Sequence, residues 1–157
     1  MRYLYLLSFI IFLNLGYAKS VKCEFEEVYQ DGSIQSGLML FSDGLLRYQY
    51  NDKQLFTIIF NKNYFVINNN NKNAVKKLED DIILNELKLI INNYPKIKSF
   101  YTKDEIEIEL FDSKEHKFLK RVSIKSPNVN LSIYFINCDY EVISSRYFQP
   151  LLLQDIK

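Results

Sequence analysis

The stretch LLRYQYNDKQLFTIIFNKNYFVI, residues 45–67, decides the fold of this chain. Polar turn residues divide it into three short predicted strands: 45–50, 55–60 and 64–67. The middle strand is apolar on both faces, with Leu55 and Ile59 on one side and Phe56, Ile58 and Phe60 on the other. An antiparallel sheet with one face in water alternates apolar and polar residues. We therefore expect both faces of this strand to be covered.

Alternation and turn residues predict more strands on either side of this stretch. Upstream they cover 22–28 and 34–41, with the hairpin signal Asp31-Gly32 between them. Downstream they cover 98–101, 105–111, 117–124, 130–136 and 140–147. This pattern predicts a mainly β (α+β) fold: a curved antiparallel sheet, or incomplete β-barrel, with a helical lid insertion.

The helical insertion is predicted over residues 74–93, where apolar residues follow helical spacing. Asp80 or Asp81 is expected to cap a helix within this stretch, and Asn92, Asn93 and Pro95 are expected to end it. The apolar face is broad enough to predict burial on more than one side. Such a helix lying across a curved sheet would leave an apolar concavity between the layers. Ordinary packing without a cavity is the alternative.

Residues 1–18 are predicted to be a signal peptide. Arg2 is followed by a mostly apolar run over 4–15, and Gly16-Tyr17-Ala18 places small residues before the expected cleavage site. An uncleaved anchor is the alternative. Export to the periplasm would leave one domain, residues 19–157. Lys22 precedes Cys23 where a lipid-modified cysteine would need a small residue.

The exported part of the chain contains two cysteines, Cys23 and Cys138. An even number in an oxidising compartment suggests a disulfide, and two buried free thiols are the alternative. Residues 19–157 carry nineteen basic and nineteen acidic side chains. Without a basic field, nucleic acid is not an expected partner.

Recognisable catalytic patterns are absent from the sequence. The one histidine, His116, lies in a charged run and is expected to be a solvated loop residue. Spacing typical of a Ser-His-Asp triad, a metal site or a phosphate-binding glycine loop is not found. Glu105, Glu107 and Glu109 share one face of a strand and are expected to form a solvated edge. We therefore expect no enzymatic activity, no metal and no cofactor.

A series of motifs runs in order along most of the exported chain. It comprises Phe25, Val28, Asp31-Gly32, Ser36-Gly37-Leu38, Leu46-Arg47-Tyr48-Gln49-Tyr50, Thr57-Ile58-Ile59-Phe60, Asn61-Lys62-Asn63, Tyr64-Phe65-Val66, a helical insertion over 81–92, and Phe148-Gln149-Pro150. This series resembles the LolA family, the periplasmic carriers of outer-membrane lipoproteins. Family members usually begin with an amphipathic helix and often have Arg-Pro before the aromatic strand, where this chain has Ser42-Asp43-Gly44.

The resemblance implies a monomeric carrier that holds acyl chains of lipoproteins or lipids in the concavity. Its partners would be inner- and outer-membrane lipoprotein-sorting components. The expected wall residues are Leu46, Tyr48, Tyr50, Phe56, Ile58 and Phe60, and the expected lid residues are Leu84, Leu87 and Ile91. Core packing is the alternative for each. The second hypothesis is an envelope β-sheet module that binds a protein partner and has a solid core.

Overall fold

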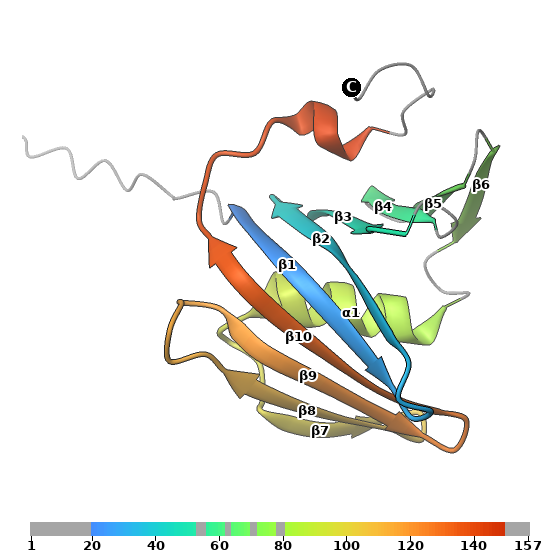
Figure 1. Ribbon diagram of the computed structural model, residues 1–157, viewed down its shortest axis with the longest axis vertical. Coiled ribbons are helices and arrows are strands. Elements are labelled where there is room, and N and C mark those ends of the chain that lie inside the picture. Colours follow the sequence, from blue (N-terminus) through green and yellow to red (C-terminus); the bar gives the residue numbers. More distant parts are fainter. Residues whose placement is uncertain (1–19, 53–55, 62–63, 70–71, 78–80, 150–157) are drawn as a thin grey trace, which may run out of the picture.

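The computed structural model describes residues 20–52, 56–61, 64–69, 72–77 and 81–149 (Figure 1). The predicted signal peptide and Leu55 lie outside these residues. The strands are β1 (Ser20–Tyr29), β2 (Ile34–Ser42), β3 (Leu45–Tyr50), β4 (Thr57–Asn61), β5 (Tyr64–Asn69), β6 (Lys72–Lys77), β7 (Phe100–Lys103), β8 (Ile106–Asp112), β9 (Leu119–Ser126) and β10 (Val129–Asp139). The helices are α1 (Ile82–Asn93) and a short 3₁₀ turn, η2 (Ser145–Phe148). Within the described residues, no helix is long and apolar enough to cross a membrane.

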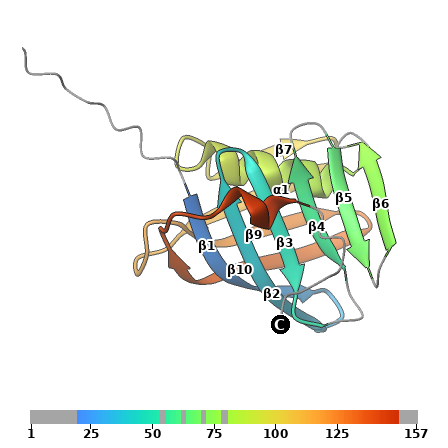
Figure 2. The ribbon, with the colours of Figure 1, turned by 90° about the horizontal axis from the view of Figure 1, so that it is seen from above.

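All ten strands form one antiparallel sheet, which confirms the mainly β prediction. Their order is β6-β5-β4-β3-β2-β1-β10-β9-β8-β7. Two meanders, one on each side of α1 in the sequence, are therefore joined by pairing of the first strand with the last. The sheet bends at this junction, so that both meanders face α1 (Figure 2). One apolar core contains side chains from both meanders and from the helix.

Two predicted elements are wrong. Residues 74–77 belong to strand β6, which pairs along its full length with β5, and only 82–93 are helical. Ala74 and Val75 alone do not make a helical stripe, and Val75 is 68% exposed on the sheet edge. Residues 140–147 are not a strand: 140–144 form a loop, and 145–147 belong to η2. The expected cap is confirmed, since the Asp81 side chain accepts a hydrogen bond from the Leu84 N–H at 3.0 Å.

The helix is buried on one side, contrary to the expectation of burial on several. Leu87, Ile90 and Ile91 enter the core, whereas Ile82 and Leu89 are exposed. The far side of α1 therefore faces away from the sheet.

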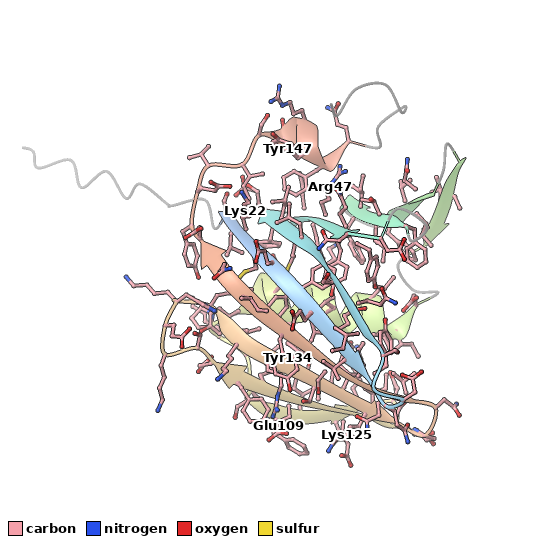
Figure 3. The ribbon with its side chains drawn as sticks, in the orientation of Figure 1. Lys22, Arg47, Glu109, Lys125, Tyr134 and Tyr147 are labelled. Carbon is pink, nitrogen blue, oxygen red and sulfur yellow. A yellow bond between two sulfur atoms is a disulfide. The ribbon has the colours of Figure 1, made fainter. Side chains whose placement is uncertain are left out.

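Residues 140–149 cover the opposite face of the sheet (Figures 1 and 2). Ile143 and Phe148 pack against an outer apolar cluster that includes Leu40 and Ile59. The buried Arg47 holds this segment against the sheet, because its Nη1 donates a hydrogen bond to the Tyr147 carbonyl at 3.0 Å (Figure 3). Strand β4 is thus covered on both faces, which explains its doubly apolar sequence.

A β-bulge in β10 brings the two cysteines together. The register of β1 and β10 shifts between Lys22 and Glu24, so Asn137 and Cys138 both lie opposite Cys23. Asn137 has φ 48°, a left-handed conformation that Asn adopts more readily than most residues. The extra residue reverses the alternation of β10, and Cys138 therefore points into the core, where it forms a disulfide with Cys23.

Replacing Asn137 tests whether the bulge sets this geometry. Asn137→Val and Asn137→Gly both remove the side-chain hydrogen bond to Glu24, but only valine opposes a positive φ. We expect Asn137→Val to be less stable than Asn137→Gly by roughly 1–2 kcal/mol in urea unfolding of the oxidised proteins. Equal stability of the two variants would show that the bulge carries no backbone constraint.

Candidate functional site

The expected wall and lid residues gather in one interior cluster between the sheet and α1. Six are at most 2% exposed: Leu46, Tyr48, Ile58, Phe60, Leu87 and Ile91. The other three, Tyr50, Phe56 and Leu84, are half-buried at the edge of the cluster. Side chains with so little accessible surface have neighbours on all sides. In this conformation the six therefore fill the space that the sequence analysis expected to be a concavity.

Four aromatic rings form a ladder at one end of the cluster. Phe25 stacks on Tyr48 with ring centroids 3.8 Å apart, and Tyr50 meets both rings edge-on. Phe56 extends the ladder, with its centroid 5.7 Å from that of Tyr50. Gly37 makes room for this arrangement, because a Cβ there would lie 2.4 Å from Phe25 Cζ. The ladder leads from the buried interior toward the half-buried edge of the cluster.

A buried carboxylate, Glu27, lies among the tyrosines. It is 4% exposed and accepts three hydroxyl hydrogen bonds: from Tyr29 at 2.6 Å, from Tyr48 at 2.9 Å and from Tyr50 at 3.0 Å. An ionised carboxylate offers only acceptors, so it can take all three donors. Hydrogen bonds to a charged group contribute about 1.5–3 kcal/mol each, which offsets a desolvation cost of several kcal/mol.

Glu27 is not among the residues predicted from the sequence, although its position in β1 carries a signal. Alternation along β1 places residue 27 on the same face as Cys23 and Phe25, and Tyr29 follows on that face. A carboxylate on an apolar strand face needs partners. The three tyrosines are those partners, but only the folded sheet brings Tyr48 and Tyr50 next to Glu27.

The same environment keeps the three tyrosines protonated. Burial raises the pKa of Tyr29, Tyr48 and Tyr50 above the ordinary value of 10, and the negative charge of Glu27 raises it further. Ionisation would place several negative charges together in a region of low polarity. The tyrosines therefore remain hydrogen-bond donors to Glu27 at neutral pH.

A pocket of about 260 Å³ opens beside this cluster, lined by Tyr29, Asp31, Ser33, Gln35, Tyr50 and Phe56. Two of these, Tyr50 and Phe56, are expected wall residues. Asp31 Oδ1 accepts hydrogen bonds from the Ser33 N–H at 2.9 Å and its hydroxyl at 2.6 Å. These bonds lower the pKa of Asp31, so its carboxylate remains charged at neutral pH. The pocket thus combines aromatic walls with one exposed negative charge.

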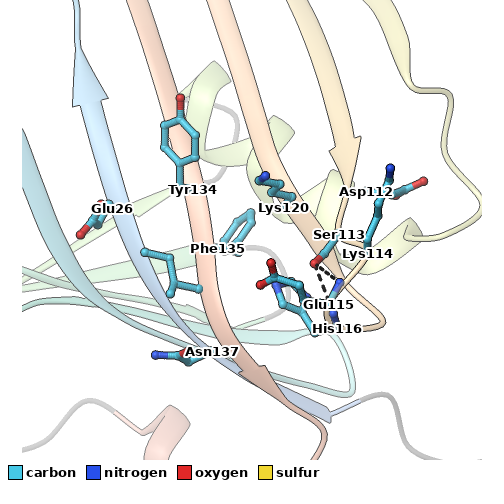
Figure 4. A pocket seen from close by; sticks show the side chains of 11 residues that line it. Glu26, Asp112, Ser113, Lys114, Glu115, His116, Lys120, Tyr134, Phe135 and Asn137 are labelled. Atoms are coloured by element: carbon cyan, nitrogen blue, oxygen red, sulfur yellow. Dashed lines mark hydrogen bonds between the residues drawn. The ribbon is translucent and has the colours of Figure 1, made fainter.

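A larger pocket of about 440 Å³ lies between β1, β10 and the β8–β9 loop (Figure 4). His116, expected to be solvated, is half-buried at its side, and its Nδ1 is buried without a hydrogen-bond partner. The Ser113 Oγ accepts from the N–H groups of Glu115 and His116, so it caps a turn. Because the lining contains three acidic and three basic or imidazole side chains, its charge favours no single class of ligand.

The tyrosines around Glu27 make the free energy of unfolding fall with rising pH in the alkaline range. Because the pKa of Tyr48 is raised on folding, its contribution is fully present below pH 10 and is lost as the pH rises above 10, at up to about 1.4 kcal/mol per pH unit. We expect Tyr48→Phe to make this fall shallower, and to cost about 1–3 kcal/mol at pH 7 because Glu27 loses a donor.

Chemical unfolding measured from pH 7 to 11.5 checks this expectation. The control is Tyr147→Phe, which changes an exposed ring and leaves the carbonyl that Arg47 binds. Parallel pH profiles for the wild type and Tyr48→Phe above pH 10 would contradict the assignment.

In the part of the chain that the structure describes, no three His, Cys, Asp or Glu side chains gather as a metal site. The chain matches no protein-family model and no curated protein. The resemblance to the LolA family therefore stays a prediction that depends on the motifs quoted above.

Proposed function

We propose that this protein is a periplasmic carrier whose cargo is the acyl chains of lipoproteins or lipids. The chains would lie between the sheet of an incomplete β-barrel and helix α1, which would act as a lid. The observation that carries the proposal is that, in the described residues, one helix covers the apolar inner face of a strongly bent sheet (Figure 2). An apolar face under a single removable element is what an acyl carrier needs.

Binding would require α1 to separate from the sheet, because side chains fill the interior in the present conformation. Exposing Leu87, Ile90 and Ile91 costs roughly 5–9 kcal/mol at 1.5–3 kcal/mol each. Burying the fourteen methylenes of a sixteen-carbon chain would stabilise the complex by about 11 kcal/mol. The two terms are similar in size, so exchange of the lid contacts for an acyl chain is energetically feasible and reversible.

A polar contact would hold the lid in place. Glu86 on α1 is buried, and its carboxylate accepts from the Tyr101 hydroxyl at 3.2 Å and pairs with Lys103, both on β7. Removing one partner of a buried ion pair destabilises the arrangement strongly, although Lys103 is itself 45% exposed and the effect is smaller here. Loss of this contact would favour lid opening.

The disulfide is consistent with a site of action outside the cytoplasm, where such bonds form and persist. In the proposed role, an inner-membrane component would load the carrier and an outer-membrane component would unload it. A receptor with a better-shaped apolar groove is enough for release, since transfer between two apolar sites needs no chemical step.

The direct test is acyl binding by the oxidised, natively purified protein. We expect co-purifying acyl lipids in its mass spectrum and saturable one-to-one binding of cis-parinaric acid, displaced by palmitate. A protein that is free of lipid and does not bind the probe would overturn the carrier and favour a protein-binding module.

A matched pair of lysine variants tests the lid. Lys103→Ala removes the charged partner of Glu86 and leaves Tyr101 in place, whereas Lys125→Ala removes an exposed lysine from β9. We expect faster parinaric acid association for Lys103→Ala and no change for Lys125→Ala. An unchanged rate for Lys103→Ala would show that Glu86 and Lys103 do not restrain the lid.

A further inference from the structure

The pocket beside the Glu27 cluster has a charge that selects its ligand. Among the described residues, its lining contains three aromatic rings, two of them from tyrosines, together with one carboxylate, one serine hydroxyl and one amide, and no basic side chain. Its volume of about 260 Å³ is below the usual range for drug-sized ligands and suits a small chemical group.

The lining is rich in aromatic rings, which can attract a cation. The rings of Tyr50 and Phe56 stand at 82° to each other, forming a corner. The face of an aromatic ring attracts a cation, and quaternary ammonium groups are commonly bound by several such rings. Asp31 adds a full negative charge at the rim of the pocket.

Glu27 adds to the preference of the pocket for a cation, although it does not line the pocket itself. Its Oε2 accepts hydrogen bonds from the hydroxyls of both Tyr29 and Tyr50, so a second carboxylate lies one hydrogen bond away from two of the rings. An anion would meet repulsion from Asp31 and Glu27 together. An ammonium group would be attracted by both carboxylates and by the rings.

We propose that this pocket binds the alkylammonium headgroup of a lipid. The inference rests on the proposed carrier function and names the cargo more closely: a lipid whose acyl chain lies under α1 and whose headgroup ammonium lies among Tyr29, Asp31, Tyr50 and Phe56. The pocket suits this role because Tyr29, Tyr50 and Phe56 also pack against the interior cluster. Headgroup and chain could therefore occupy adjoining spaces.

The test compares two lysophospholipids with the same sixteen-carbon chain, one with a phosphocholine and one with a phosphoglycerol headgroup, below their micelle concentrations. We expect the wild type to prefer phosphocholine by about tenfold, the size of one cation–π contact. Gln35→Lys, which adds a positive charge to the lining, should abolish the preference. Gln35→Glu, at the same position, should increase it. Palmitate affinity measured on each variant reports whether acyl binding is retained.

The outcomes separate the two proposals. Equal affinities, or a preference for phosphoglycerol, would overturn the headgroup site and leave the carrier proposal intact. If neither lysophospholipid nor palmitate binds, the carrier proposal fails. Titration with tetramethylammonium alone then decides the pocket: saturable binding weakened by Gln35→Lys supports a cation site, and no binding overturns it.

Discussion

The pairing of β1 with β10 is the constraint on which the rest of the structure depends. It joins the strands that come first and last in the chain, and the Cys23–Cys138 disulfide links them across 115 residues. Each of the two meanders is local in sequence, and this pairing unites them into one sheet. Closing so long a loop costs considerable chain entropy, and a covalent link removes much of that cost from folding. The bulge at Asn137 permits the link, because in a regular register Cys138 would lie opposite Lys22 and point to the other face of the sheet.

This junction creates the inner face and places the candidate site on it. The same β1 strand that carries Cys23 presents Phe25 and Glu27 to the interior, where they meet the tyrosines of β3. The junction is covalent and its strands are paired on both sides, whereas α1 is held by apolar side chains and by the contacts of Glu86. The molecule thus combines a firmly fixed sheet with a cover that depends on a few residues, which is the physical basis of the carrier proposal.

Sequence reasoning reached the parts of the fold that local pattern determines. Alternation predicted most strands, Asp31-Gly32 predicted the first hairpin, and the expected cap at Asp80 or Asp81 includes the residue that caps α1. It failed where distant contacts decide. Residues 72–77 are a strand because β5 offers an unpaired edge, and residues 140–149 leave the sheet because the outer face of β2 and β4 needs a cover. Glu27 looked like one more acid of a charged strand, since only the folded sheet supplies its three donors.

Amide hydrogen exchange tests most directly whether a fixed sheet carries a removable cover. We predict that α1 amides exchange through an opening that requires less free energy than exchange in β1 and β10. Saturation with palmitate should alter protection in α1 and β3–β4 while leaving β1 and β10 unchanged. If α1 instead exchanges only with the global unfolding that exposes β1 and β10, the helix is a permanent part of the core. The proposed lid role of α1, and with it the proposed carrier function, would then be wrong.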